Sequence, residues 1–305
     1  YYLKNDEMMP ENALDVLSKF DSILLGAVGD PKVSDHITLN GLLLPIRRRF
    51  DQYVSVRPCY LWKNTDSVLK NASNLDFVII RENSEGEYAN IGGFLHASNE
   101  FETSIQTAVF TRMGCTRIIQ YAFEHAISRN NKLKVTSITK SNAQAFGMVM
   151  WDNCFKEVSE RYPNIATESL LVDAACMDLV RRPEDFDVIV ASNLFGDILS
   201  DLGAGITGGM GTAPSSNINP SKNLPSMFEP VHGSAPDISG KGIANPLAAI
   251  LSAAMMASYL GYSKIEDIIR QAVQKTINDN IITKDMGGNN STEEVIKNVE
   301  LNIIS

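Results

Sequence analysis

The sequence predicts an α/β protein with a mainly parallel sheet, and three observations favour this class. Short β-type runs alternate along the chain with segments whose apolar residues recur at helical spacing. The β-type runs are almost continuously apolar, which is typical of strands that are covered on both faces. Several of these runs end in polar residues, and ligands of open α/β sheets bind at the carboxyl ends of strands.

The elements follow from local patterns. Strands are predicted at 21–29, 76–82, 134–140 and 187–193. Helices are predicted at 116–130 and 146–163. Three of the strands end at Arg81, Lys140 and Asn193, which we expect to converge on one cleft.

Two further helices are predicted near the carboxyl end of the chain. The apolar run 245–261 is too short to span a bilayer comfortably, and it has Asn245 as N-cap, Pro246 at the first position and Gly261 at the C-cap. We interpret it as a buried helix. Ser291 and Glu294 form a capping box that opens the last helix.

Composition limits the classes of function. The chain has 305 residues, of which 44% are hydrophobic and 21% charged, as expected for a globular protein of two domains. The net charge of −9 does not favour binding to nucleic acid or to an anionic membrane. The 4 cysteines are scattered without a CxxC pair, which indicates free thiols in a reducing compartment. No secretory signal is visible, so we expect a cytoplasmic protein.

The stretch SNLFGDILSDLG (192–203) places two aspartates in an apolar helical pattern. Asp197 and Asp201 are four residues apart, so they lie on one face of a helix and repel each other by about 0.2–0.5 kcal/mol. Either they face water together with Ser200, or a positive group lies between them. The spacing alone favours the first alternative. The following GAGITG (203–208) matches a dinucleotide fingerprint, but it comes after a helix rather than a strand, so we interpret it as a flexible connector.

Arginines and a tyrosine are candidates for binding an acidic ligand. Arg47 and Arg57 lie ten residues apart, and their planar forks suit carboxylates. The alternative for Arg47 is a solvated helix face with an i,i+4 pair to Asp51. Arg81 ends a strand and Tyr88 follows it by seven residues, although this segment could equally be an exposed loop.

A lysine and a further aspartate are candidates for proton transfer or ligation. Lys140 and Asn142 follow a strand, and a lysine in a cleft can act as a base, although most such lysines lie on the surface. Asp173 follows three apolar residues, so its carboxylate is expected to need a partner.

The segment FEPVHGSAPDISGKGIANP (228–246) has the Gly, Ser, Pro and Asn content of a structured loop. The NH groups of residues 233–235 are suited to cradle an anion, His232 to contact a ring and Asp237 to hold a diol. The alternative is an ordinary ordered loop.

Taken together, these segments closely resemble one family. SNLFGDILSDLG, FEPVHGSAPDISGKGIANP, RENSEGEY, TKSN and the RP at 57–58 match, in order along nearly the whole chain, the metal-dependent decarboxylating β-hydroxyacid dehydrogenases, the isocitrate/isopropylmalate dehydrogenase family. The segments 26–41, 50–58 and 85–93 are most similar to the tartrate/D-malate branch of that family.

The resemblance implies the isopropylmalate dehydrogenase type of two-domain α/β fold rather than a Rossmann fold. It places 1–52 and 209–305 in a cofactor-side domain, and 53–208 in a domain for substrate, metal and dimerisation. The first strand of the family and its glycine turn have no counterpart here, so we expect about one βα unit to lie upstream of Tyr1 or to be missing.

The resemblance also implies the site. Asp197 and Asp201 match metal ligands, and Asp173 matches a ligand and substrate contact contributed by the second subunit of a homodimer with a shared active site. Three carboxylates favour Mg²⁺ or Mn²⁺. The residues matched to substrate carboxylates are Arg47, Arg57 and Arg81. The acid–base pair is matched by Tyr88 and by Lys140 of the second subunit.

The cofactor implied is NAD. Asn142 lies where the family approaches the nicotinamide ring, and Asp237 is expected to select NAD over NADP by repelling a 2′-phosphate. The residues matched to the cofactor loop are His232, Gly233, Ser234, Ala235, Asp237 and Asn245.

The function implied is NAD- and divalent-metal-dependent oxidation of a small 2-hydroxy dicarboxylic acid, D-malate or tartrate, with decarboxylation of the former. Gly41 stands where isocitrate enzymes carry a serine, which argues against isocitrate. Leu43 and Leu44 leave 3-isopropylmalate as an alternative substrate. An alternative of another class is a non-catalytic regulatory paralogue, although every matched chemical residue is present. We expect no nucleic-acid or membrane partner.

Overall fold

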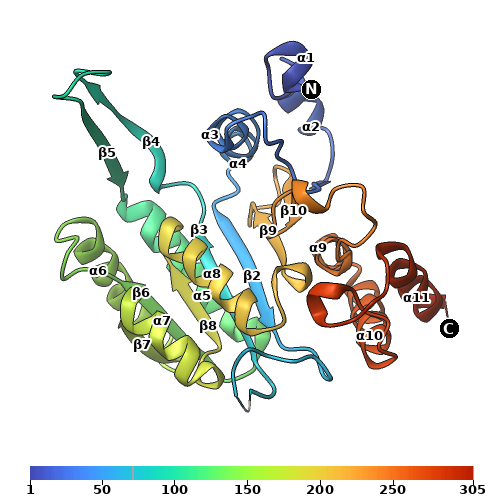
Figure 1. Ribbon diagram of the computed structural model, residues 1–305. Coiled ribbons are helices and arrows are strands. Elements are labelled where there is room, and N and C mark those ends of the chain that lie inside the picture. The colour runs from blue at the N-terminus through green and yellow to red at the C-terminus, as the bar shows by residue number, and fades with distance from the viewer. Residues whose placement is uncertain (71, 305) are drawn as a thin grey trace. The chain divides into compact units, whose positions relative to one another are not determined.

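The computed structural model describes residues 1–70 and 72–304 (Figure 1). The chain divides into two compact units, which we call unit 1 (Tyr1–Phe77 with Ser200–Ser305) and unit 2 (Val78–Leu199). The boundaries of these units differ from those predicted at 52/53 and 208/209. The predicted division into a cofactor-side and a substrate-side domain stays a prediction.

Unit 2 is built on a parallel sheet in the order β3-β8-β6-β7. Its strands are β3 (Asp76–Glu82), β6 (Lys134–Thr139), β7 (Ala166–Leu171) and β8 (Val188–Ala191). In the register, Val78 lies opposite Val188, and Val135 lies opposite both Val188 and Thr167. The predicted parallel sheet is confirmed, as are three of its strands. Strand β7 was not predicted from the sequence.

The parallel order brings chemically useful residues to one edge of this sheet. Arg81 lies near the end of β3, Asn193 follows β8, Lys140 follows β6 and Asp173 follows β7. Because the strands are parallel, their carboxyl ends share one edge. The expectation that Arg81, Lys140 and Asn193 converge is thus confirmed for their strand ends.

Three helices accompany the sheet of unit 2: α5 (Arg112–Arg129), α6 (Gly147–Ser159) and α7 (Val172–Arg181). The α5 helix begins before the predicted residue 116 because the Thr111 side chain accepts a hydrogen bond from Gly114 N at 2.9 Å and caps it. Phe123 of α5 and Trp151 of α6 are fully buried, and the Trp151 indole donates to Ser137 Oγ at 2.9 Å. The unit therefore has its own apolar core.

An antiparallel arm projects from unit 2 (Figure 1, upper left). It consists of β4 (Gly86–Leu95) and β5 (Thr103–Val109), with Ile91 opposite Thr107 and Leu95 opposite Thr103. Phe94 and Phe101 are each 69% exposed. The exposed-loop alternative for the segment around Tyr88 is wrong, since Tyr88 lies near the start of β4.

Unit 1 contains a mixed sheet in the order β1-β10-β9-β2. Its strands are β1 (Ser22–Leu24), β2 (Val54–Tyr60), β9 (Pro214–Ile218) and β10 (Ser226–Pro230). Only β1 and β10 pair in parallel; β9 is antiparallel to both of its neighbours. The predicted strand 21–29 is wrong in length and burial, because three residues form β1 and Leu24 is 52% exposed.

The helices of unit 1 lie at both ends of the chain. They are α1 (Tyr2–Asn5), α2 (Ala13–Leu17), α3 (Asp35–Thr38), α4 (Leu44–Arg49), α9 (Leu247–Tyr259), α10 (Ser263–Asn278) and α11 (Thr292–Ile304). A π-helical turn, Leu39–Leu43, joins α3 to α4. Leu251, Val273 and Val295 bring the three long helices into one apolar cluster.

The predicted start of α11 agrees with the structure, and the predicted caps of α9 are each off by one residue, since α9 has Pro246 as N-cap and Leu260 as C-cap. Asn245 Oδ1 accepts from Leu247 N at 3.0 Å, while Gly261 has φ 97° and Tyr262 N donates to Ala257 O. This is the arrangement of a Schellman motif. Ser291 N and Oγ both donate to Glu294 Oε2, at 2.7 and 2.9 Å, which forms the capping box of α11.

The helix α8 (Asn193–Ile206) carries both aspartates of the SNLFGDILSDLG stretch. It extends through Gly203 and Gly205, so the interpretation of residues 203–208 as a flexible connector is wrong. A Cβ at Gly203 would lie 2.5 Å from Cys59 Sγ, which explains why this glycine is inside a helix.

The remaining predictions about the chain's class concern membranes and thiols. Among the residues that the structure describes, no helix combines the length and apolar character needed to cross a bilayer. All four cysteines are free thiols, as predicted.

His125 of α5 makes stability sensitive to acid. Burial, with the nearby Arg129 charge, lowers its pKa from 6.5 to about 4. Between these values the unfolded chain binds a proton that the folded chain does not, so stability is complete above pH 6.5 and falls as the pH drops toward 4. His125→Phe is expected to reduce the loss between pH 7 and 5 by about 2 kcal/mol, measured by urea unfolding. The exposed His96→Gln serves as control, and equal losses in His125→Phe and wild type would contradict the prediction.

Candidate active site

A buried guanidinium lies at the carboxyl end of β3. Arg81 is 2% exposed, and its Nε and Nη2 donate to Asn193 Oδ1 at 2.9 and 2.7 Å. Its Nη1 forms an ion pair with Asp197 Oδ1. Because a charge removed from water needs compensation, these contacts from the first turns of α8 allow Arg81 to be buried.

Tyr88 completes this cluster within unit 2. Its hydroxyl donates to Asp197 Oδ2 at 2.8 Å, and the Arg81 guanidinium carbon lies 5.1 Å from the centre of its ring. Burial raises the pKa of Tyr88, and the Asp197 charge raises it further. Tyr88 therefore keeps its proton at neutral pH and can donate it.

The turn between β3 and β4 is held by a buried carboxylate. Glu82 accepts from Ser84 N at 2.9 Å, Ser84 Oγ at 2.5 Å and Glu85 N at 2.8 Å. Burial raises the pKa of Glu82. Asn193 Nδ2 donates to Glu85 O at 2.9 Å, which ties the same turn to α8. The sequence analysis placed Asn193 at a strand end but assigned it no role, and it did not single out Glu82.

Lys140 and Asp173 form a second charged group in unit 2. Lys140 Nζ forms an ion pair with Asp173 Oδ1 in the first turn of α7. The hydrogen bond from Lys140 holds the pKa of Asp173 below its usual value, so Asp173 stays ionised. The predicted need for a partner is met, although the Asp173 side chain is 64% exposed.

The second aspartate of α8 also has an arginine beside it, in unit 1. Arg57 Nη1 donates to Ser200 Oγ at 2.6 Å and lies 3.9 Å from Asp201 Oδ1. Asp197 and Asp201, one turn apart on α8, are therefore each compensated by an arginine, Arg81 and Arg57 respectively. A simple solvated face does not describe this pair.

The three predicted metal ligands do not gather within one chain. Over residues 1–70 and 72–304, no group of three or more His, Cys, Asp or Glu side chains is close enough to hold a metal ion. Asp173 thus does not join Asp197 and Asp201 as a third ligand from the same chain.

Arg47 of α4 is buried and pairs with a residue that the sequence analysis missed. Its Nη2 lies 3.0 Å from Glu229 Oε1 of β10, which also accepts from Asn217 Nδ2 at 2.8 Å. The alternative of a solvated helix face is wrong for Arg47. Glu229 stands in the FEPVHG stretch, but a single carboxylate beside a proline gives no signal of its distant partner.

The predicted cofactor loop adopts irregular structure in unit 1. Ala235 has φ 43°, and Asp237 is exposed on a 3₁₀ turn, Pro236–Ile238. His232 Nδ1 lies 2.9 Å from Gly233 O. A Cβ on Gly29 would lie 2.9 Å from Ser234 Oγ, so the segments 26–29 and 232–235 approach closely.

Hydrogen bonds anchor the end of this loop. Asn245 Nδ2 donates to Asp285 Oδ2 at 3.0 Å, and Thr292 Oγ1 donates to Ala244 O at 2.5 Å. Asn142, the remaining predicted cofactor residue, is exposed in the turn after β6.

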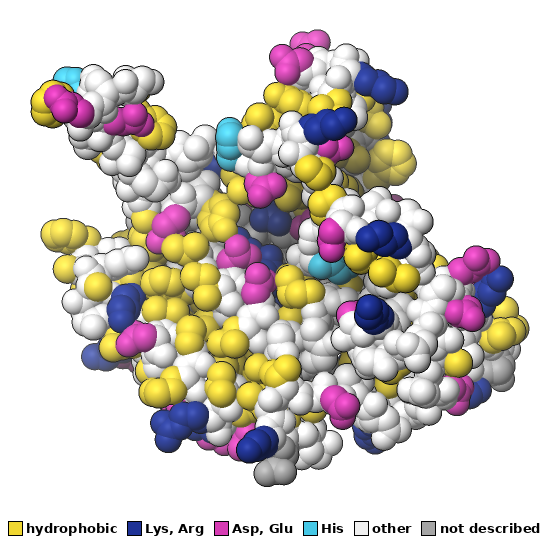
Figure 2. Space-filling view, in the orientation of Figure 1, with side chains coloured by type: hydrophobic (Ala, Val, Ile, Leu, Met, Phe, Trp, Pro, Cys, Tyr) yellow, Lys and Arg dark blue, Asp and Glu magenta, His cyan; other side chains and the backbone are white. Residues whose placement is uncertain are grey.

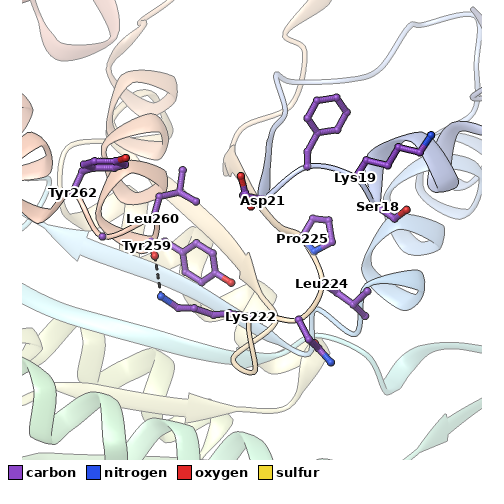
Figure 3. A pocket seen from close by; sticks show the side chains of 12 residues that line it. Ser18, Lys19, Asp21, Lys222, Leu224, Pro225, Tyr259, Leu260 and Tyr262 are labelled. Carbon is purple, nitrogen blue, oxygen red and sulfur yellow. Dashed lines mark hydrogen bonds between the residues drawn. The ribbon is translucent and has the colours of Figure 1, made fainter.

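A pocket of about 640 Å³ lies elsewhere in unit 1 (Figure 3). It is lined by the turns 18–21, 222–225 and 259–262. Lys222 Nζ donates to Tyr259 O at 2.9 Å and lies 4.5 Å from the centre of the Tyr259 ring. None of the residues predicted to function lines this pocket.

Comparison with known proteins shows the family. A model of the isocitrate/isopropylmalate dehydrogenase family matches residues 1–299. The chain is 48% identical to the tartrate dehydrogenase/decarboxylase of Pseudomonas putida, over 97% of this chain and 83% of that protein. It is also 48% identical to the decarboxylating D-malate dehydrogenase of Escherichia coli K12, over 97% of this chain and 84% of that protein.

Comparison with a solved structure supports the same family fold. The crystal structure of isocitrate dehydrogenase from Methylococcus capsulatus superposes with a TM-score of 0.89 at 34% identity, over 97% of this chain and 86% of that chain. The chain belongs to the isocitrate/isopropylmalate dehydrogenase family. The predicted family and fold class are confirmed, and the chain is an enzyme of the decarboxylating dehydrogenase type. The roles of individual residues in this family member stay predictions.

A substitution of Gly196 in α8 tests whether the helix packs closely against Arg81. A Cβ at Gly196 would lie 2.7 Å from Cβ and Cγ of Arg81, whereas a Cβ at Gly205 of the same helix meets nothing within 4 Å. Gly196→Ala is expected to destabilise the protein by about 1–3 kcal/mol through overpacking. Gly205→Ala is expected to be neutral or to stabilise by up to about 1 kcal/mol. Urea unfolding measures both, and equal effects would show that α8 does not press against Arg81.

Proposed function

We propose that this enzyme catalyses the NAD- and divalent-metal-dependent oxidation of a small 2-hydroxy dicarboxylic acid, D-malate or tartrate, with decarboxylation of D-malate. The observation that carries the proposal is the Asp197 carboxylate held between the Arg81 guanidinium and the Tyr88 hydroxyl. The proposed cation ligand, Asp197, is thus in direct contact with a carboxylate-binding group, Arg81, and a proton donor, Tyr88. The names of the relatives, tartrate dehydrogenase/decarboxylase and D-malate dehydrogenase, support this substrate class.

The donor set fits a hard divalent cation. Asp197, Asp201 and Asp173 offer only carboxylate oxygens, which Mg²⁺ and Mn²⁺ prefer. Their side chains are 33%, 57% and 64% exposed, so an ion can reach them. When bound, such an ion would polarise the hydroxyl and carbonyl oxygens of the substrate.

The other side chains supply binding and proton transfer. Arg47, Arg57 and Arg81 would bind the substrate carboxylates, for which their planar forks are suited. Lys140 would take the hydroxyl proton, and Tyr88 would return a proton to the carbon that loses CO₂. The position of the Tyr88 hydroxyl, 2.8 Å from Asp197 Oδ2, supports the second role, because it lies beside the proposed cation ligand.

The loop from His232 to Asn245 would hold NAD. Its backbone turns sharply at Ala235, and the exposed Asp237 carboxylate is available to bind a ribose diol and to repel a 2′-phosphate. When bound there, NAD would supply the hydride-accepting chemistry of the oxidation. Asn142, exposed after β6, would approach the nicotinamide.

We also propose that the enzyme is a homodimer whose copies share active sites. Figure 2 shows hydrophobic side chains gathered over the α6, α7 and α8 face of unit 2. The exposed large apolar side chains of that face are Phe146, Val149, Met177, Val180 and Ile198. The β4–β5 arm exposes others, among them Phe94 and Phe101. Apolar surface of this extent is typical of an interface, and a second copy would bring its Lys140 and Asp173 to the Asp197 cluster.

Turnover tests the function. Purified enzyme with NAD and Mn²⁺ is offered D-malate, L-tartrate, 3-isopropylmalate and isocitrate, and NADH formation is measured. We expect turnover of D-malate or L-tartrate, loss of turnover with a chelator, and recovery with Mg²⁺ or Mn²⁺. Lys140→Met should lower kcat by about 10²–10⁴-fold.

The matched control is Lys264→Met, an exposed lysine of α10 outside both the proposed site and the proposed dimer face, which should keep wild-type kcat. Preferential turnover of 3-isopropylmalate would overturn the substrate assignment. An absence of turnover with all four acids would contradict the proposed function as a whole.

A further inference from the structure

One buried amide, that of Asn193, binds Arg81 directly and also binds the turn that precedes the Tyr88 strand. We propose that Asn193 is a positioning residue: it orients Arg81 and thereby sets the affinity for the hydroxy diacid. This inference rests on the function proposed above, in which Arg81 binds a substrate carboxylate.

The hydrogen bonds of Asn193 determine the plane of the guanidinium. Nε and Nη2 of Arg81 lie on one side of the guanidinium, and both donate to the single Oδ1 of Asn193, at 2.9 and 2.7 Å. Two donors on one acceptor restrict rotation about the last bonds of the arginine. The Nη1 side is then directed toward Asp197.

The orientation of the amide is fixed by its other contact. Nδ2 of Asn193 donates to Glu85 O at 2.9 Å. If the amide were flipped, Nδ2 of Asn193 would face the N–H groups of Arg81, and Oδ1 would face the carbonyl oxygen of Glu85. Donors would then face donors and acceptors would face acceptors, so only the observed orientation satisfies every group. Asn193 is 2% exposed, so no bulk water can replace these bonds if they are removed.

A neutral acceptor suits the proposed task better than a carboxylate. Asn193 fixes the geometry of Arg81 without adding a negative charge beside it. An aspartate at this position would still accept hydrogen bonds from Arg81. Its negative charge would, however, compete with a substrate carboxylate for the Arg81 guanidinium. The residue type therefore indicates positioning rather than charge compensation, which Asp197 already supplies.

The Asn193 amide also contacts the turn that leads to Tyr88. Glu85, whose carbonyl it binds, directly precedes Gly86, the first residue of β4. Gly86 has φ 73°, and a Cβ there would lie 3.3 Å from Asn193 Cβ. The turn that leads into the Tyr88 strand thus packs directly on Asn193.

The test compares KM and kcat in Asn193→Ala, Arg81→Lys and the double variant. Loss of a hydrogen-bond acceptor for a charged group is expected to raise KM for the diacid by about 10–100-fold, with KM for NAD changed less than about two-fold. Lysine lacks Nε, so Arg81→Lys already removes this contact. The double variant should then be no worse than Arg81→Lys alone, within about two-fold. An unchanged KM in Asn193→Ala, or effects that multiply, would overturn the inference.

Asn219→Ala is the matched control, because Asn219 is also 2% exposed and donates to a backbone carbonyl, Phe50 O at 2.9 Å, outside the proposed site. It should lower Tm without changing KM for the diacid. If Asn193→Ala does not fold, Asn193→Ser carries the test: its hydroxyl is too short to accept from both Nε and Nη2 of Arg81, so KM for the diacid should rise at least about ten-fold, and an unchanged KM would overturn the inference.

The two proposals fail in different ways. No turnover by the wild-type enzyme would overturn the proposed function and this inference with it. Wild-type turnover together with a normal KM in the Asn193 variants would overturn only the inference.

Discussion

The compensation of a buried guanidinium is the constraint on which the candidate site depends. Arg81 lies near the end of β3 and is 2% exposed, so an uncompensated charge there would cost several kcal/mol. The first turns of α8 supply both the counter-charge, Asp197, and the neutral acceptor, Asn193. Because Gly196 has no side chain, α8 can lie against Arg81 closely enough to do so. Folding of unit 2 therefore places these groups together before any ligand arrives.

The pair of aspartates on α8 follows the same physical logic. Two like charges one turn apart are unfavourable, and each is offset by an arginine, Arg81 for Asp197 and Arg57 for Asp201. Those arginines are also the groups that the family resemblance assigns to substrate carboxylates. Both aspartates are thus paired with arginines within the chain, and under the proposed function a cation with an acidic substrate would exchange these partners.

The sequence predicted buried strands with nearly continuous apolar runs, but it missed β2, β9 and β10, which are also largely buried, because serine, asparagine, arginine or proline interrupts their apolar runs. The β3, β6 and β8 strands are apolar runs and were located closely, and the caps of α9 and α11 were read from single residues. The edge strand β7 was missed because three consecutive polar residues, Thr167–Ser169, interrupt its apolar pattern and because it is partly exposed. The arm was missed because glycine and polar residues in β4 hide its strand pattern, and β1 was overestimated because its apolar run continues beyond the paired residues.

The sequence predicted which residues belong to the candidate site, but it did not predict which side chains contact one another. Asp197, Arg81, Tyr88 and Lys140 stand in motifs whose order along the chain is recognisable. Their contacts depend on which strands are neighbours, and local sequence does not encode that information. For this reason the Arg47–Glu229 and Arg81–Asn193 contacts appeared only in the structure. The Lys140–Asp173 pair likewise joins residues that follow adjacent strands, β6 and β7.

The central claim is that Lys140 and Asp173 of one copy complete the Asp197 cluster of another. Co-expression of a Lys140→Met chain and an Asp197→Asn chain, each with its own tag, allows the mixed dimer to be purified. If active sites are shared, one of the two sites in that dimer has both residues intact, so about half of the wild-type activity should return although each variant alone is inactive. If every site is built from a single chain, both sites of the mixed dimer lack an essential residue, and the absence of any recovered activity would contradict the account.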